Sequence, residues 1–96
     1  KHLTAGPEVL TLAGQRFHKA AAELAINAIE RLPKDQRNVS GLTLGISRKA
    51  YDAICQEAEA FRKKVVEIAD RDPKAEGVYQ LNIHLVPLSN PERSAP

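Results

Sequence analysis

The 96-residue sequence predicts an α+β domain, a two-layer α-β-α-β arrangement with two long helices on one face of a small sheet. Two observations predict this fold class. Apolar residues recur at spacings of three and four over residues 10–29 and again over 51–68, which indicates two amphipathic helices. Apolar and polar residues alternate with a period of two over residues 39–46 and 78–88, as they do in half-buried strands.

The first helix is predicted to begin near Gly6-Pro7, with Thr4 as an alternative N-cap, and to end before Pro33. Proline at the first helical position loses no hydrogen bond. Pro33 disfavours the α region for Leu32 and so ends the helix. The apolar stripe of this helix consists of Leu10, Ala13, Phe17, Ala20, Leu24, Ala28 and Ile29.

The first strand is predicted over Val39–Ile46. One face carries larger residues, and the other carries Gly41, Thr43 and Gly45. Glycine weakens a strand unless something approaches its backbone closely. The small face of this strand is therefore an unusual feature that calls for a neighbour.

The second helix is predicted to begin after Ser47, a favoured N-cap residue, and to close at Asp72-Pro73. Correctly oriented i,i+4 pairs, Glu59 with Lys63 and Glu67 with Arg71, support it. Its stripe is the most regular in the chain. The stripe consists of Tyr51, Ile54, Ala58, Phe61, Val65 and Ile68.

The second strand is predicted over Val78–Leu88. A strand, a helix and a strand in succession imply two parallel strands joined by a right-handed crossover, with antiparallel pairing as the alternative. Two strands make a marginal sheet with exposed edges. We therefore expect dimerisation, or missing parts of the parent chain, to complete the sheet.

Residues 1–89 are predicted to form a single domain, and residues 90–96 a flexible tail. Lys1 in place of methionine indicates a fragment of a longer protein. The net charge of +2 does not by itself favour nucleic acid. Because Cys55 is the only cysteine and no apolar run is long enough to span a membrane, we expect a cytoplasmic protein that does not enter membranes.

No catalytic motif is visible, and we expect a protein that is not an enzyme and has no cofactor. His2, His18 and His84 lie in three different elements, with no metal-ligand spacing to a cysteine or carboxylate, so we expect no metal. Cys55 lies one position off the second stripe and is best explained as a small hydrophobe. A GxxxxGK[ST] phosphate loop is absent.

The basic runs are the weakest candidate site. Direct nucleic-acid binding through them is the third alternative, because no aromatic platform accompanies the charge and acidic residues are interspersed. The candidate residues are Arg48, Lys49, Arg62, Lys63 and Lys64.

The polar face of the last strand is the stronger candidate. It is predicted to lie beside the small face of the first strand, where it forms a ligand site or an interface with a second copy, or remains a solvated sheet face. An enzyme or ligand-binding domain using Gln80, Asn82 and His84 is the alternative function. The combined candidate surface consists of Gly41, Thr43, Gly45, Gln80, Asn82 and His84.

Several segments resemble one bacterial family. They are the first-helix segment RFHKAAAELAINAIERLP, Arg37-Asn38-Val39-Ser40, LTLGIS before the helix with Tyr51, Phe61-Arg62-Lys63, and VYQLNIHLVPLS. Over about residues 10–89 the chain is similar to the domain-of-unknown-function family 4423. Arg37, Tyr79, Gln80, Leu81 and Asn82 match its most recognisable positions.

The resemblance implies that the chain is the C-terminal domain of a conserved bacterial protein, one of those predicted to be transcriptional regulators. It further implies an N-terminal DNA-binding region in the same parent protein. Together with the exposed strand edges, it predicts a non-enzymatic dimerisation or signal-receiving domain that forms a homodimer.

Overall fold

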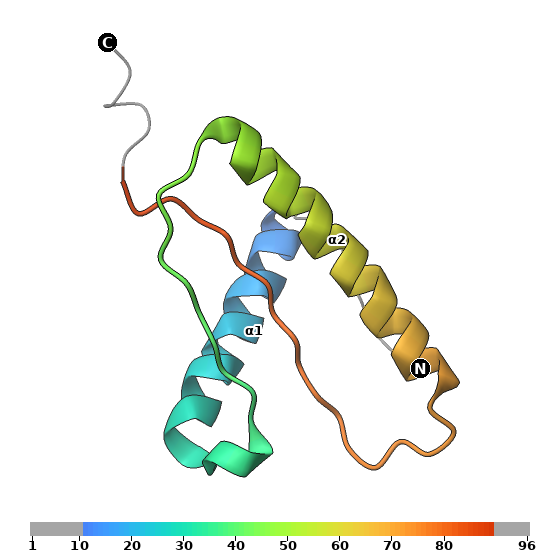
Figure 1. Ribbon diagram of the computed structural model, residues 1–96. Coiled ribbons are helices and arrows are strands. Elements are labelled where there is room, and N and C mark those ends of the chain that lie inside the picture. Colours follow the sequence, from blue (N-terminus) through green and yellow to red (C-terminus); the bar gives the residue numbers. More distant parts are fainter. Residues whose placement is uncertain (1–10, 90–96) are drawn as a thin grey trace.

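The computed structural model describes residues 11–89, which fold into two long α-helices and one short 3-10 helix (Figure 1). Helix α1 spans Leu12–Arg31, η1 spans Lys34–Gln36 and α2 spans Arg48–Arg71. Residues 37–47 and 72–89 are extended chain, and residues 11–89 contain no β-strand. The described fold is therefore all-α. The predicted α+β two-layer fold is wrong, and with it the sheet that dimerisation or missing parts of the parent chain were expected to complete.

Helix α1 starts later than predicted and ends where predicted. Thr11 is its N-cap, in an extended conformation, and the Thr11 hydroxyl accepts a hydrogen bond of 3.0 Å from the Gly14 N–H. The predicted start at Thr4 to Pro7 lies outside the described residues. At the other end Leu32 is extended, with φ −96° and ψ 143°, because Pro33 follows it.

Helix α2 confirms its predicted bounds. The Ser47 hydroxyl accepts a 3.1 Å hydrogen bond from the Ala50 N–H, which satisfies one of the free donors of the first turn. Asp72 is extended and precedes Pro73. Glu59 Oε1 lies 3.9 Å from Lys63 Nζ, as predicted. The Glu67–Arg71 pair forms no salt bridge in the described part of the chain.

The two extended segments explain why the sheet prediction failed. Residues 39–46 and 78–88 run in the same direction in Figure 1. No backbone hydrogen bond joins them within the described residues. Side chains from both segments line grooves between them instead. Alternation with a period of two thus indicated an extended backbone with two different faces, but it did not specify a hydrogen-bonding partner.

The two helices do not pack directly on one another. No Cα atom of α1 lies within 8 Å of a Cα atom of α2. The helices diverge in Figure 1, and the extended residues 78–88 cross the space between them. Ala21, 4% exposed, is the one buried residue in the described range, and this extended segment reaches it.

The stripe predicted on α2 is largely confirmed, and the stripe predicted on α1 is largely wrong. Four of the six α2 stripe residues are half-buried, whereas Phe61 and Ile68 are exposed. On α1 the predicted stripe residues Phe17, Leu24 and Ile29 are exposed. The less exposed side of α1 consists of Gly14, His18, Ala21, Ala22, Ala28 and Leu32.

The composition of α1 accounts for this difference. Apolar residues cover much more than one narrow stripe of the helix, so periodicity alone did not fix which side faces inward. Small residues such as Gly14 and Ala21 let another backbone approach closely. In the structure it is this small side that is covered, and the larger side chains of Phe17 and Leu24 remain exposed.

Candidate functional site

Two grooves separate the extended segments from each other and from the helices. The large groove, about 1480 Å³, lies between the C-terminal half of α1, residues 35–40, the middle of α2 and residues 78–84. The small groove, about 630 Å³, lies between residues 42–48, Tyr51 and residues 85–89. All but one of the predicted surface residues line one of these two grooves.

The polar residues Gln80, Asn82 and His84 line the large groove, and so do Leu81 and Ile83, which alternate with them. Gln80 Nε2 donates a 3.1 Å hydrogen bond to Asn82 Oδ1. Asn82 Nδ2 in turn donates a 2.9 Å hydrogen bond to the backbone carbonyl of Ala21. The two amides therefore form a short chain of hydrogen bonds that holds residues 78–84 against α1. His84 is exposed in the same groove.

The small residues of the first extended segment do not join this polar group. Thr43 and Gly45 line the small groove, and Gly41 lines neither groove. A Cβ atom built at Gly41 or at Gly45 would meet nothing within 4 Å. The close neighbour that these glycines led us to expect is therefore absent from the described structure, and the six candidates form two groups. A ligand-binding or interface role for either group stays a prediction.

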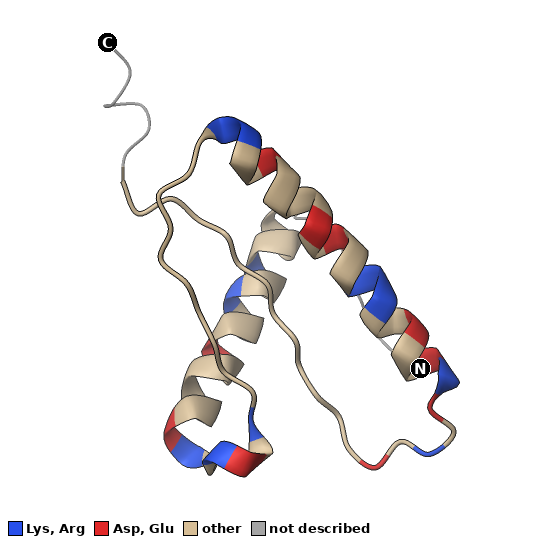
Figure 2. Ribbon diagram, in the orientation of Figure 1, with Lys and Arg blue, Asp and Glu red and all other residues tan. Residues whose placement is uncertain are grey.

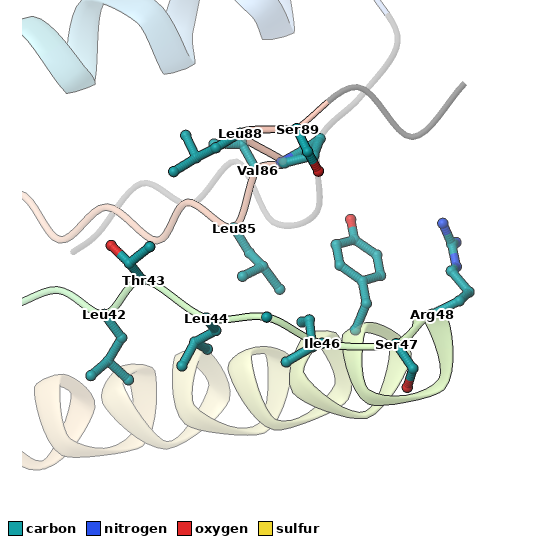
Figure 3. A pocket seen from close by; sticks show the side chains of 13 residues that line it. Leu42, Thr43, Leu44, Ile46, Ser47, Arg48, Leu85, Val86, Leu88 and Ser89 are labelled. Atoms are coloured by element: carbon teal, nitrogen blue, oxygen red, sulfur yellow. The ribbon is translucent and has the colours of Figure 1, made fainter. Parts of the chain in front are cut away.

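The small groove is mainly apolar. Leu42, Leu44, Ile46 and Leu85 line it. Figure 3 shows Leu85 extending toward the first extended segment, whereas Leu42 and Leu44 extend away from Leu85, toward α2. Arg48 lies at one end, where its guanidinium carbon is 4.8 Å from the centre of the Tyr51 ring. No acidic residue lines this groove. Its chemistry suits an apolar occupant.

Tyr51 connects this groove to the only cysteine. The hydrogen bond with the Cys55 side chain raises the pKa of the Tyr51 phenol above its ordinary value of 10.0, and the charge of the Cys55 thiolate raises it further. Cys55 is exposed and forms no disulfide. The Tyr51 phenol therefore remains a neutral hydrogen-bonding group at physiological pH.

The basic residues lie in two separate groups on α2, each beside a carboxylate (Figure 2). Arg48 Nε lies 3.1 Å from Asp52 Oδ1. Arg62 and Lys63 each place a nitrogen 3.9 Å from Glu59 Oε1. This arrangement is a mixed-charge helix surface. Nucleic-acid binding by these residues, with Lys49 and Lys64, stays a prediction.

The histidines remain apart in the described structure. His18 Nε2 is buried without a hydrogen-bond partner there, the His18 ring meets the Phe17 ring edge-on, and His84 lies in the large groove. His2 lies outside the described residues. Within residues 11–89, no group of three or more His, Cys, Asp or Glu side chains is placed to hold a metal ion.

Two contacts with α1 were missed from the sequence. Arg37 Nε donates a 3.0 Å hydrogen bond to the Leu32 carbonyl and so caps the end of α1. Basic side chains close to the end of a helix often hydrogen-bond its last carbonyl groups, so the position of Arg37 could have predicted this contact. The bond from Asn82 to Ala21 crosses 61 positions of sequence and had no local signal.

The exposure of many large apolar side chains was also missed. They lie on both helices and on both extended segments of the described residues. The exposed large apolar residues are Leu12, Phe17, Leu24, Ile26, Ile29, Val39, Leu42, Leu44, Ile46, Phe61, Ile68, Val78, Tyr79, Leu81, Ile83, Val86 and Leu88.

Neither described helix has an apolar stretch sufficient to cross a membrane. Comparison with protein families gives a match over residues 1–88 to the family described as Domain of unknown function (DUF4423). No curated protein and no solved structure matches the sequence. The resemblance carried by the first-helix segment and by residues 78–89 is thereby confirmed at the level of the family. The chain belongs to the family described as Domain of unknown function (DUF4423).

Proposed function

We propose that this chain is a non-enzymatic self-association module that forms a homodimer. The observation that carries the proposal is the surface area of the chain. Its accessible surface is 9108 Å². A compact monomer of its mass, 10.5 kDa, has about 5,400 Å². The difference exceeds one partner's share of a large homodimer interface, which buries about 2,000–5,000 Å² over both partners.

The chemistry of the excess surface supports the same proposal. Leu42, Tyr79 and Leu88 are each at least 85% exposed. Burying one large apolar side chain contributes about 1.5–3 kcal/mol. Covering several of these side chains would therefore stabilise an association strongly.

The family resemblance supplies the biological context. It implies a parent protein that is a transcriptional regulator with a DNA-binding region N-terminal to this domain. We infer that self-association of this domain would hold two such regions in a symmetric pair. Dimeric DNA-binding proteins read two half-sites whose separation matches the spacing of their recognition elements.

Sedimentation equilibrium of the 96-residue chain tests this proposal. We expect a dimer at micromolar concentration that dissociates on dilution. Dilution calorimetry at several temperatures should show a heat-capacity change of the sign that apolar burial gives. A chain that stays monomeric up to high micromolar concentration, with its helical circular dichroism intact, contradicts the proposal.

A further inference from the structure

Helix α1 has an apolar seam on its exposed flank. The seam consists of Ala13, Phe17, Ala20 and Leu24, which are separated by four, three and four residues. All four are exposed, with Phe17 at 40% and Leu24 at 59%. This spacing is that of the a and d positions of a coiled-coil heptad, which repeat along one side of a helix and pack against a second helix.

The two borders of the seam differ. On the inner border Gly14 is half-buried and Ala21 is buried, so this side faces the rest of the molecule. On the outer border lie Arg16 and Glu23, which are both exposed. Neither has a salt-bridge partner within the described residues. A helix placed on the seam would therefore meet one unpaired cation and one unpaired anion along its outer side.

Side-chain size distinguishes the ways in which two copies of the seam could pack. In an antiparallel pair, Phe17 faces Ala20 of the second copy, and Leu24 faces Ala13. Every layer then combines one large residue with one small residue, which fills the space evenly. In a parallel pair Phe17 would face Phe17 and Ala20 would face Ala20, so that crowded layers would alternate with voids.

The border charges favour the same orientation. In the antiparallel pair, Arg16 of each copy lies beside Glu23 of the other, and the two-fold axis generates this contact twice. In the parallel pair, the neighbour of Arg16 would be Ala21 of the second copy, which carries no charge. Charged residues that border a heptad seam select the orientation of the partner helix.

We propose that the α1 seam packs against the α1 seam of a second copy in antiparallel orientation, with the two-fold axis passing between Phe17 and Ala20. The proposal rests on the self-association proposed above and assigns one contact surface to it. Leu42, Tyr79 and Leu88 lie outside this surface. The interface is isologous, since the same residues contribute from both copies. Leu24 also lines the large groove, so the second copy covers one edge of that groove. The small groove is lined by no residue of α1 and remains accessible.

Cysteine cross-linking tests the orientation. Cys55→Ser removes the native thiol, and Ala13→Cys and Leu24→Cys are introduced separately into that background. We expect neither variant to cross-link to itself under oxidation, whereas an equilibrated mixture forms the mixed dimer, identified by mass spectrometry. Gln15→Cys, which lies off the seam, is the control and should not cross-link in any combination.

The other outcomes of this experiment separate the two proposals. Self-cross-linking of Ala13→Cys or of Leu24→Cys would overturn the antiparallel pairing. A dimer by sedimentation without any cross-link would overturn the seam as the interface and leave self-association standing. A monomer by sedimentation would overturn both proposals.

A charge exchange provides an independent readout. Arg16→Glu places two like-charged pairs across the interface, and we expect it to weaken the dimer about three- to ten-fold at low salt. The double variant Arg16→Glu/Glu23→Arg should restore the original dissociation constant. Because these charges are exposed, the effect should decrease as salt is added. Failure of the second substitution to restore binding would overturn the proposed contact.

Discussion

Helix α2 and the extended residues 72–89 that follow it satisfy their polar groups in opposite ways. Helix α2 forms its hydrogen bonds within itself, and Ser47 caps its first turn. The extended segment depends on contacts made by side chains. Lys74 N–H donates to the Asp72 carboxylate at 3.0 Å, and Asn82 reaches the Ala21 carbonyl at 2.9 Å.

The difference shows which part of the chain depends on its surroundings. A helix is specified by local sequence, because each backbone bond joins residues four apart. An extended segment has no internal partners, and an unpaired buried backbone group is costly. Most side chains of residues 72–89 are exposed, including Val78 and Tyr79. The stability of the extended part therefore depends more on its contacts with the rest of the molecule than that of α2 does.

The largest effect on the free energy of unfolding is expected where the extended segment contacts α1. Ala21→Leu adds three carbon atoms to the one buried position of the described chain, directly beside the attachment of Asn82. Overpacking of this kind typically costs about 1–3 kcal/mol. We expect the free energy of unfolding, measured by urea titration, to fall by this amount.

Ala53→Leu is the matched control, because Ala53 is exposed on α2. Its effect should stay within about 0.5 kcal/mol. If the two substitutions lowered the free energy of unfolding equally, Ala21 would not be a packing position in solution. The contact between α1 and the extended segment would then not contribute to stability as the comparison requires.

An intermediate effect is expected from the hydrogen bond that attaches the extended segment. Asn82→Ala removes the donor to the Ala21 carbonyl, and a net loss of about 0.5–1.5 kcal/mol is typical. The loss should be local, with faster chymotryptic cleavage at Tyr79 and unchanged helical circular dichroism.

Gln80→Ala provides the comparison for this attachment. It leaves the bond from Asn82 to Ala21 in place and removes only the bond that Gln80 donates to Asn82. Cleavage at Tyr79 should therefore change less than in Asn82→Ala. If Gln80→Ala accelerated cleavage as much as Asn82→Ala, the attachment would depend on the whole segment and not on this one bond.

The smallest effect is expected within α2, on the pKa of the Tyr51 phenol. The Tyr51 pKa is raised by the hydrogen bond and charge of Cys55. In a Tyr79→Phe background, Tyr51 is the only tyrosine. Cys55→Ala should then lower the pKa of Tyr51 toward the ordinary value of 10.0, as followed by the ultraviolet absorbance of tyrosinate. Cys55→Ser, which keeps a hydrogen-bonding group, should lower the pKa less.

Features set by local sequence could be predicted. Ser47 predicted the start of α2, and Pro33 and Pro73 predicted where the two helices end, because caps and prolines act on neighbouring backbone. The alternation of apolar and polar residues over 78–88 correctly predicted an extended backbone. The alternation could not predict that the two extended segments form no sheet, because hydrogen bonding between strands depends on residues far away in sequence.

The surroundings of the candidate residues could be predicted only in part. Gln80, Asn82 and His84 line the large groove, but Leu81 and Ile83, which alternate with them, line it as well. The separation of the polar residues from Thr43 and Gly45 depends on the placement of the two extended segments, which no local pattern encodes. The inward side of α1 was missed because apolar residues occur on several sides of this helix, and Ala21 lies only one position from Ala20, which the predicted stripe included.

The bond between Asn82 and Ala21 also has a consequence for how quickly this chain folds. It joins residues 61 positions apart, and closing a loop of that length costs about 3.6 kcal/mol of chain entropy. One hydrogen bond returns only about 0.5–1.5 kcal/mol, so apolar contacts must supply the remainder. Helices form within microseconds from local contacts, whereas this closure must search for a distant partner. We therefore expect the docking of residues 78–84 on α1 to be a late kinetic step that follows helix formation.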